Sequence, residues 1–257
     1  MLLRRQFVFL IGRGSLGVAL LGTVACRSTG DTQAPASTGS TAPSSDRTST
    51  TAAVSTTSAA VADRAWERVD LGFVSAYILV RAGEAAVIDT GSEGSAGAIE
   101  GALSALGAGW EGVSNVILTH SHGDHVGSLD AVLAAAESAT PSAGEPDIAA
   151  IRSSRPITAL AEGDAVFGLE VIATPGHTPG HISLLDPDLR ILFAGDALNG
   201  GDGVVLGPNP EFTPDMDTAM SSVGKLAGFD YDLIVFGHGD PVGDRPVDQV
   251  AGLAAGA

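Results

Sequence analysis

The sequence predicts an α+β protein in which two β-sheets lie between helices, and three observations support this fold class. Short β-rich runs occur in blocks after residue 64, with segments of helical periodicity between and after them. Hydrophobic residues make up 44% of the 257-residue chain, which is enough for one sizeable core. Every histidine falls in one of three short segments that each directly follow a predicted strand, as expected where strand ends converge at one edge of a sheet.

Residues 1–26 are expected to be an export signal. Arg4 and Arg5 open a basic segment, and the apolar stretch that follows is too short to span a bilayer as a helix of about 20 residues. The Arg-Arg-x-Phe pattern resembles a twin-arginine signal, and the Thr-Val-Ala-Cys sequence resembles a lipoprotein processing box. The sequence therefore predicts an exported, extracytoplasmic protein that is lipid-anchored through Cys26 at the outer face of the cell membrane. Cleavage after Ala25, with secretion and a free Cys26, is the alternative.

Residues 27–63 are expected to form a disordered linker in front of a single domain at 64–257. The linker consists mostly of Ser, Thr, Ala, Gly and Pro, and its only large apolar residues are Val54 and Val61. Such a segment buries too little surface to offset the conformational entropy that folding would cost it. We therefore expect it to act as a flexible stalk.

The domain is expected to begin with three strands, a helix and a fourth strand. Turn-forming glycines separate the β-rich runs Trp66–Leu71, Phe73–Val80 and Ala85–Asp89. Ser95–Leu106 follows with apolar residues at helical spacing. Val113–Thr119, which contains Val116, Ile117 and Leu118 in succession, is expected to be a buried strand.

Strands and helices continue through the rest of the domain. Further strands are predicted at Asp147–Ile151, Val166–Thr174, Ile182–Leu185, Arg190–Phe193 and Leu233–Phe236. Further helices are predicted at Ser128–Glu137, Asp215–Leu226 and Val247–Leu253. The Pro-, Gly- and Ser-rich segment 140–147 is expected to be a surface excursion, and Asn199–Gly203 a flexible loop beside the pocket. Phe73 and Tyr77 are expected in the core, with the apolar wall of the pocket as the alternative.

Charge and cysteine content exclude several classes of partner. The chain has 13 Lys and Arg against 30 Asp and Glu, so its formal net charge is −17. A surface this acidic repels phosphate backbones and anionic lipid headgroups, which argues against nucleic acid as a partner. A single cysteine excludes a disulfide framework and a Cys-based zinc site. The expected partner is a small-molecule substrate, with the membrane reached only through the anchor at Cys26, and the sequence does not define the oligomeric state.

The six histidines gather in three short segments that have the composition of a metal centre. They are His120, His122, His125, His177, His181 and His238. A His-x-His pair in extended chain places both imidazoles on one face, because side chains alternate along a strand. Asp124 lies inside the first segment, and a fourth segment delivers Asp196 to the end of its own strand. Neutral imidazoles and carboxylates are the natural ligands of Zn²⁺ and similar ions, so this set predicts metal binding.

The order of these motifs resembles that of the metallo-β-lactamase-fold hydrolase superfamily, over roughly residues 66–240. The matching blocks are Asp89-Thr90-Gly91, His120-x-His122-x-Asp124-His125, Gly-His177, Gly-Asp196 and Gly-His238. The resemblance implies an αββα sandwich with a two-metal site. It implies that one ion is held by His120, His122 and His177, the other by Asp124, His125 and His238, and that Asp196 bridges the two. It also implies that Asp89 and His181 support the ligands from behind without binding metal.

The implied site favours hydrolysis. Two divalent ions, zinc first with manganese or iron as alternatives, trap a bridging hydroxide and polarise the oxygen of the substrate. Asp124 is also a catalytic candidate that exchanges a proton with the attacking water or the leaving group. We therefore expect a metal-dependent hydrolase of a small ester, thioester or lactone, with thioester and lactone equally favoured.

Departures from related families narrow the substrate, and two other functions stay open. Superfamily β-lactamases generally lack the bridging aspartate, whereas this chain has Asp196, so penicillin hydrolysis is disfavoured. Glyoxalase II has the same seven ligands but adds a helical C-terminal region, which we do not expect in the 19 residues after His238 (257 − 238). Nuclease relatives need a basic surface, whereas this chain is acidic, so nuclease activity is disfavoured. The alternatives are an oxidoreductase similar to persulfide dioxygenases, which use a single iron, and a non-catalytic metal-binding lipoprotein.

Overall fold

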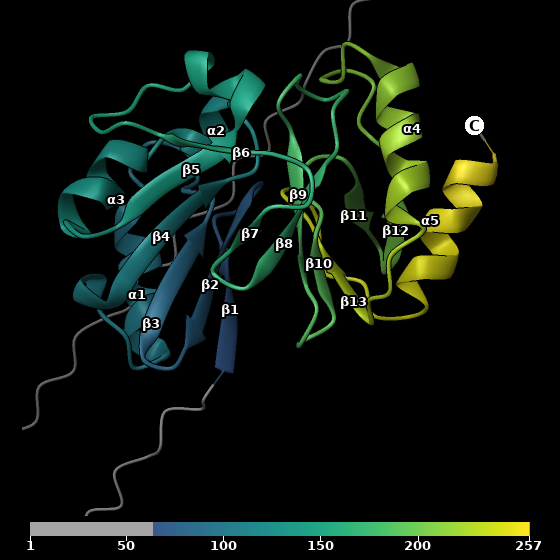
Figure 1. Cartoon of the computed structure of the whole chain (residues 1–257). Helices are drawn as coiled ribbons and strands as arrows, with labels where there is room; N and C mark the ends of the chain where they lie inside the picture. Colours follow the sequence, from purple (N-terminus) through teal and green to yellow (C-terminus); the bar gives the residue numbers. More distant parts are fainter. Residues whose placement is uncertain (1–63, 257) are drawn as a thin grey trace, which may run out of the picture. The chain divides into compact units, whose positions relative to one another are not determined.

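The computed structural model describes residues 64–256 (Figure 1). The predicted export signal at 1–26, including Cys26, and the predicted linker at 27–63 lie outside the described residues, as does Ala257. The expectations about export, lipidation and disorder therefore stay predictions. Among residues 64–256, no helix has the length and apolar character required to cross a membrane.

A six-stranded sheet forms the first half of the domain. Its strands, in spatial order, are β1 (Arg64–Asp70), β2 (Ser75–Arg81), β3 (Glu84–Ile88), β4 (Val113–Leu118), β5 (Thr140–Gly144) and β6 (Thr158–Leu160). The first three strands are antiparallel, whereas β3 to β6 run parallel. Helices α1 (Ala96–Ala105) and α3 (Leu129–Ala135) cover its outer face, and the short helix η1 (Trp110–Gly112) leads into β4 (Figure 1).

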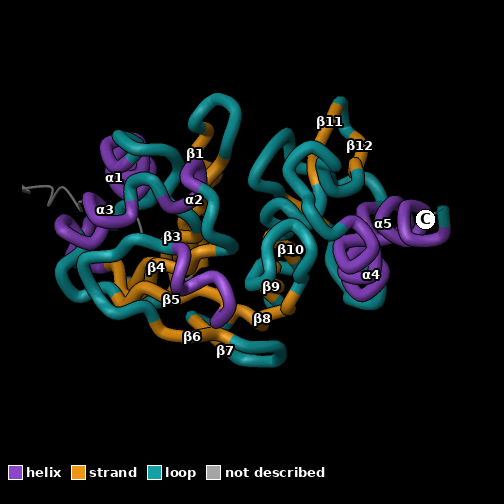
Figure 2. The backbone as a smooth tube through the Cα atoms, turned by 90° about the horizontal axis from the view of Figure 1, so that it is seen from above, coloured by secondary structure: helices purple, strands orange, loops and turns teal. Residues whose placement is uncertain are grey.

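A five-stranded sheet forms the second half and packs against the first. Its order is β13 (Leu233–Val235), β10 (Ile191–Phe193), β9 (Ile182–Asp186), β8 (Leu169–Ala173) and β7 (Ala165–Val166). Only β10 and β13 are parallel. Helices α4 (Met216–Leu226) and α5 (Pro246–Ala255) cover its outer face, so that Figure 2 shows helices on both outer sides of two adjacent sheets.

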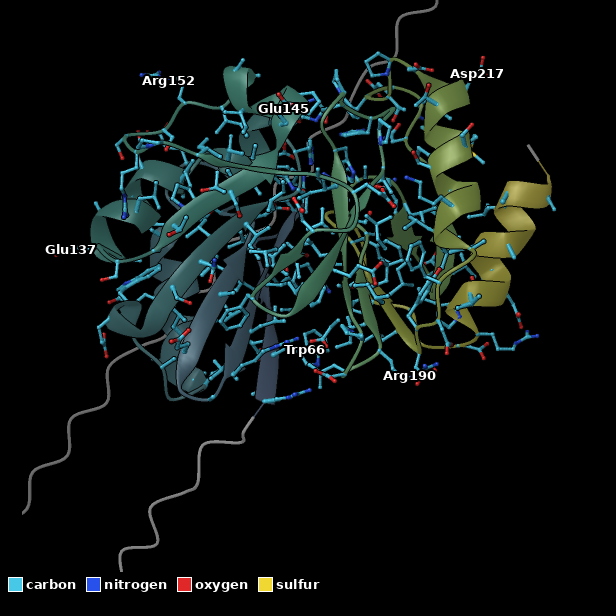
Figure 3. The ribbon with its side chains drawn as sticks, viewed as in Figure 1. Trp66, Glu137, Glu145, Arg152, Arg190 and Asp217 are labelled. Carbon is cyan, nitrogen blue, oxygen red and sulfur yellow. The ribbon has the colours of Figure 1, made fainter. Side chains whose placement is uncertain are left out.

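The apolar side chains on both faces of β2 explain why the layers form. Ile78 and Val80 point to the core beneath α1 and α3, whereas Tyr77 and Leu79 point to the core between the two sheets. All four are almost fully buried, and Figure 3 shows side chains filling the space between the sheets. A strand that is apolar on both faces must be covered on both, which gives the four layers of an αββα sandwich. The predicted fold class and the core position of Tyr77 are confirmed.

The prediction of a surface excursion at 140–147 is wrong for its first part. Residues Thr140–Gly144 form β5, a buried strand between β4 and β6. Its small residues serve close packing instead of a turn. A Cβ added at Gly144 would lie 2.0 Å from the carbonyl oxygen of Gly180, so the neighbouring loop approaches the strand too closely for any side chain. Composition alone does not separate this use of Gly, Ser and Pro from a surface loop.

The strand predicted at Asp147–Ile151 is also wrong, because this segment belongs to the short helix η2 (Glu145–Ala150). Pro146 lies in its first turn, where the missing N–H costs nothing. After β4 the chain forms the one-turn helix α2 (Gly123–Val126), which contains the candidate ligands Asp124 and His125.

Three further details differ from the expectation. The predicted loop at Asn199–Gly203 includes β11 (Asn199–Gly201), which pairs with β12 (Val204–Leu206) in a two-stranded hairpin. A turn interrupts the strand predicted at Val166–Thr174, separating β7 from β8. Phe73 precedes β2 and is 65% exposed, so its predicted core position is wrong.

Candidate metal centre

Five strand ends deliver the candidate residues to one edge of the two sheets. Asp89 follows β3, and the first histidine segment follows β4, which is parallel to β3. In the second sheet Asp196 follows β10, and His238 follows the parallel β13. The loop with His177 connects β8 to β9. Because parallel strands end at the same edge, the topology brings side chains from positions 89 to 238 together.

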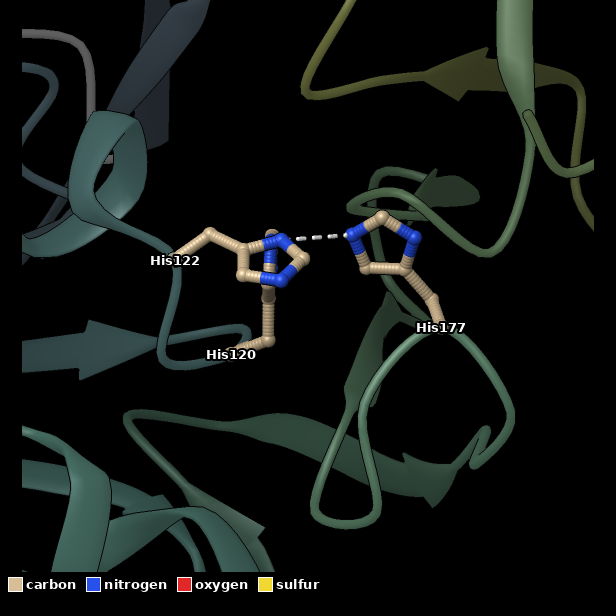
Figure 4. Close-up of side chains that lie close together, drawn as sticks. All are labelled: His120, His122 and His177. Atoms are coloured by element: carbon tan, nitrogen blue, oxygen red, sulfur yellow. Dashed lines mark hydrogen bonds between the residues drawn. The ribbon is translucent and has the colours of Figure 1, made fainter. Parts of the chain in front are cut away.

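Three imidazoles form the first group. His122 Nδ1 lies 3.0 Å from His120 Nε2 and 2.9 Å from His177 Nε2, as Figure 4 shows for these three side chains. Ligand atoms around a tetrahedral ion at about 2.1 Å lie roughly 3.4 Å apart, so the three nitrogens have close to the spacing of zinc ligands.

The second group contains two imidazoles and a carboxylate. Asp124 Oδ2 lies 3.3 Å from His238 Nε2 and 3.9 Å from His125 Nε2. These three residues again offer ligand atoms within 4.8 Å of one another. His125 is fully buried, whereas the side chains of His238 and Asp124 are each 28% exposed, so this group opens to solvent on one side.

Asp196 lies between the two groups. Its Oδ2 is 3.4 Å from His177 Nε2 and 3.2 Å from His238 Nε2, and its Oδ1 is 3.3 Å from His125 Nε2. One carboxylate therefore faces both groups of nitrogens. All seven residues predicted as ligands are brought together. Two of the compact groups they form match the two sets that the resemblance implied, and a third group joins His120, His125 and Asp196.

Hydrogen bonds on the outer sides of the imidazoles fix which nitrogen faces the centre. Four of the five candidate histidines place their outer Nδ1 against an oxygen. The pairs are His120 with Thr119 Oγ1 (3.0 Å), His125 with Asp89 Oδ2 (2.8 Å), His177 with Thr213 Oγ1 (3.1 Å) and His238 with the Phe73 carbonyl (2.5 Å). Donation from Nδ1 leaves the Nε2 lone pair directed inward, which is the arrangement of metal-ligating histidines.

Two buried atoms at the centre lack partners in the described part of the chain. Neither His125 Nε2 nor Asp196 Oδ1 makes a hydrogen bond there, although both are inaccessible to solvent. A buried acceptor without a partner costs free energy, and inward-facing lone pairs repel one another. A divalent cation would partner these buried atoms and remove the repulsion between the lone pairs. The residues present therefore fit a metal ion.

The pKa shifts of the residues around the centre also favour a bound cation. Burial alone lowers the pKa of His125, but the carboxylates of Asp89 and Asp196 outweigh it and raise that pKa well above the usual value. Burial raises the pKa of Asp196, whereas the imidazoles around it, His125 first, hold it well below the usual value. The pKa of His120 is lowered, first by burial. The ionised carboxylates stabilise positive charge on the imidazoles. A metal cation can take the place of the imidazole protons, which are then released.

Asp89 supports two ligands from behind, as the resemblance implied. Its buried carboxylate accepts hydrogen bonds from the N–H and hydroxyl of Thr119 and from His125 Nδ1, each at 2.8 Å. Since the Thr119 hydroxyl donates to Asp89, it is free to accept from His120 Nδ1. Asp89 has a φ of +58°, a left-handed conformation that aspartate tolerates better than most residues.

His181 lies outside both groups and has a separate role. Its Nε2 accepts a hydrogen bond from the Asp196 N–H at 2.9 Å, and its Nδ1 donates to Thr174 Oγ1 at 2.8 Å. That hydroxyl continues to Ser183 Oγ, which donates to a main-chain carbonyl. Complete burial lowers the pKa of His181 to about 3, so the ring stays neutral and keeps one acceptor nitrogen. His181 therefore fixes the backbone of the Asp196 loop.

Sequence reasoning missed Asp147, which joins the two loops that carry the first group. Its buried carboxylate accepts from Ser121 N–H at 2.8 Å and from Thr178 Oγ1 and Gly180 N–H at 2.7 Å each. Ser121 lies between His120 and His122, and the other two donors belong to the loop of His177. An isolated aspartate in a predicted strand carries no local signal for such a role.

Replacing Asp147 with asparagine is expected to weaken metal binding about 10–100-fold, the usual loss when a residue that orients a ligand is changed. Asparagine has the same shape, but its amide nitrogen faces N–H donors and leaves one buried donor unpaired. Metal affinity measured by competition with a chelator tests this, with the exposed Asp202→Asn as the matched control. Equal affinities in the two variants would show that Asp147 does not position the ligand loops.

The centre opens into a cavity of about 520 Å³. The lining residues are Phe73, His122, Gly123, Asp124, His177, Asp196, Asn199, Asn209, Phe212 and His238. The size is that of a small-molecule site. Apart from the candidate ligands, the lining consists of two aromatic rings, two side-chain amides and a glycine.

An αββα sandwich with this centre at its strand ends defines a class of protein, and comparison with known proteins agrees. Residues 69–238 match the family model of the metallo-beta-lactamase superfamily, and the chain belongs to that superfamily.

Particular relatives place the chain among metallo-hydrolases. It is 32% identical to the probable metallo-hydrolase YflN of Bacillus subtilis over 61% of this chain and 75% of the relative. It is 38% identical to a hydroxyacylglutathione hydrolase of Cereibacter sphaeroides over 61% of this chain and 58% of that protein. A metallo-beta-lactamase family protein of Thermus thermophilus has the same fold, with a TM-score of 0.60 and 24% identity over 76% of this chain and 79% of that one.

Proposed function

We propose that this protein is a dinuclear metal-dependent hydrolase that cleaves a small ester, thioester or lactone. The observation that carries the proposal is the convergence of seven ligand-type side chains around Asp196, whose carboxylate oxygens lie within 3.2–3.4 Å of nitrogens of His125, His177 and His238. Membership of the superfamily and the similarity to metallo-hydrolases support the reaction class.

In this proposal His120, His122 and His177 hold one ion, and Asp124, His125 and His238 hold the other. Asp196, which faces both groups, would serve both sites. Two divalent ions bound there, with zinc expected ahead of manganese or iron, would supply a Lewis acid and a water of lowered pKa. The imidazole tautomers fixed on the outer side keep the ligand nitrogens oriented without rearrangement during the reaction.

The chain's own residues direct the remaining steps. Asp124 is the candidate proton carrier because it lines the cavity and keeps one oxygen free of the hydrogen bonds found among residues 64–256. It accepts a proton from the attacking water and returns it to the leaving oxygen or sulfur. The buried side of the centre excludes bulk water, since His120, His125 and Asp196 are covered by protein.

Asp124→Asn is expected to lower kcat about 10²–10⁴-fold, the usual contribution of a positioned acid or base. Steady-state kinetics together with metal analysis separate this loss from a loss of metal. A variant that keeps both ions and full turnover would exclude Asp124 as the proton carrier.

Similarity to hydroxyacylglutathione hydrolases favours a thioester among the three bond types. The chain spans 58% of that relative, so its substrate is not carried over to this protein as a whole. A lactone or an oxygen ester uses the same attack on a polarised carbonyl.

Metal content measured together with a panel of esters, thioesters and lactones tests the proposal. We expect about two ions per chain and turnover of at least one class in the panel. One iron per chain with oxygen consumption would instead support the persulfide dioxygenase-like alternative. Bound metal without turnover of any panel member would support a non-catalytic metal-binding protein.

A further inference from the structure

Two aromatic rings form an exposed apolar part of the cavity. Phe73 is 65% exposed and Phe212 is 57% exposed, and both line the cavity above the candidate metal centre. Only two other large apolar side chains among residues 64–256, Val204 and Leu206, are comparably exposed, and neither lines the cavity. Where exposed apolar surface lies inside a pocket, an apolar part of the ligand is expected to cover it.

Both rings are fixed close to the candidate ligands. The Phe73 carbonyl accepts the hydrogen bond from His238, and the Phe73 ring stacks on that imidazole with centroids 6.0 Å apart and planes at 16°. Phe212 immediately precedes Thr213, whose hydroxyl pairs with His177 Nδ1. A group that covers these rings therefore belongs to the same small molecule as the reacting bond.

Within residues 64–256, no lysine or arginine lines the cavity. The eight in this part of the chain are Arg64, Arg68, Arg81, Arg152, Arg155, Arg190, Lys225 and Arg245. Six of them pair with acidic side chains elsewhere, and Arg155 donates to main-chain carbonyls. Arg152 lines a different cavity. A negative charge on the substrate, away from the metal ions, would therefore meet no counter-charge in this cavity.

Two side-chain amides supply the remaining polarity. Asn199 donates its Nδ2 to the Gly207 carbonyl, which leaves its Oδ1 free, and Asn209 accepts with its Oδ1 from Glu211 N–H, which leaves its Nδ2 free. Both amides line the cavity, and each keeps a polar group that no hydrogen bond among residues 64–256 uses. These groups suit an uncharged polar group such as an amide or hydroxyl.

We propose that the substrate is an uncharged acyl compound whose apolar acyl chain lies against Phe73 and Phe212. This inference rests on the proposed hydrolase function and specifies its substrate class. It excludes acyl compounds with a carboxylate at the far end of the chain and those with an anionic leaving group, such as glutathione. In the reaction water adds across the acyl bond, so that a thioester yields a carboxylic acid and a thiol.

Three matched thioesters test the charge requirement. Hexanoyl-N-acetylcysteamine is neutral, adipyl-N-acetylcysteamine adds a carboxylate to a chain of the same length, and hexanoyl-glutathione places the charges on the leaving thiol. The released thiol is measured with a chromogenic disulfide. We expect kcat/KM for each charged compound to be at least about tenfold below that for the neutral one, because the charge is desolvated without a partner.

Phe212→Ala tests the apolar contact. In the wild type we expect kcat/KM to rise about two- to fourfold for each methylene added from acetyl to hexanoyl, because each is transferred from water to an apolar surface. Phe212→Ala should lower the hexanoyl value about five- to tenfold more than it lowers the acetyl value. Leu206→Ala, which removes an exposed apolar side chain outside the cavity, is the control and should change neither value.

The outcomes separate this inference from the proposed function. If the metal-loaded wild type hydrolyses none of the three thioesters, nor any ester or lactone, the hydrolase proposal fails. If it hydrolyses a charged thioester as fast as the neutral one, only the charge requirement is overturned. If Phe212→Ala lowers acetyl and hexanoyl turnover by the same factor, the apolar chain does not lie against that ring.

Discussion

Asp196→Asn is expected to reduce kcat/KM by about 10²–10³-fold, the loss observed when a principal electrostatic contact at a reacting centre is removed. Asp196 faces nitrogens of both groups, within 3.2–3.4 Å of His125, His177 and His238. An amide has one ligand oxygen and no charge, so a pair of cations at this position loses its shared carboxylate. The metal content should fall from about two ions per chain towards one.

The measurement is metal content and kcat/KM on the same preparation. Asp202→Asn makes the same chemical change on the exposed turn between β11 and β12 and should behave as wild type. Full metal content with unchanged turnover in Asp196→Asn would show that this carboxylate does not join the two groups.

Removal of the metal ions is expected to lower the melting temperature by about 8–16 °C. A ligand present at about 1,000 times its Kd stabilises the native state by roughly 4 kcal/mol, and each kcal/mol is worth about 2–4 °C in a domain of this size. The physical reason is local, because inward lone pairs and an unpartnered carboxylate oxygen are left facing one another.

Thermal unfolding with and without a chelator measures this effect, and re-addition of zinc, manganese and iron in turn shows which ion restores it. The Asp147→Asn variant should require more metal to reach the same melting temperature. A melting temperature that is independent of every added ion would contradict a metal centre built into the fold.

The four layers were predictable because they rest on local periodicity. The continuous apolar run of β2 and the helical spacing in α1 appear directly in the sequence. The buried strand β5 was missed because its Ser, Ala and Gly residues are small for a tertiary reason, the approach of the Gly180 loop to Gly144. Nothing in residues 140–144 themselves distinguishes such packing from a turn.

The candidate ligands were predictable for a different reason. Histidine and aspartate after successive strands form a pattern whose chemistry is evident without coordinates. Asp147 was not predictable, because its role depends on two loops from positions 121 and 178–180 meeting around one carboxylate. The core was the favoured position for Phe73 because a phenylalanine beside a strand is usually buried, whereas its ring lies in the wall of the cavity and stacks on His238.

Anomalous X-ray diffraction from crystals of the metal-loaded protein tests the central claim most directly. The account predicts two anomalous peaks about 3.5–4 Å apart. One should lie against His122 Nδ1 and the other against His125 Nε2, with the carboxylate of Asp196 between them. A single peak, or two peaks of which either lies away from these residues, would contradict it.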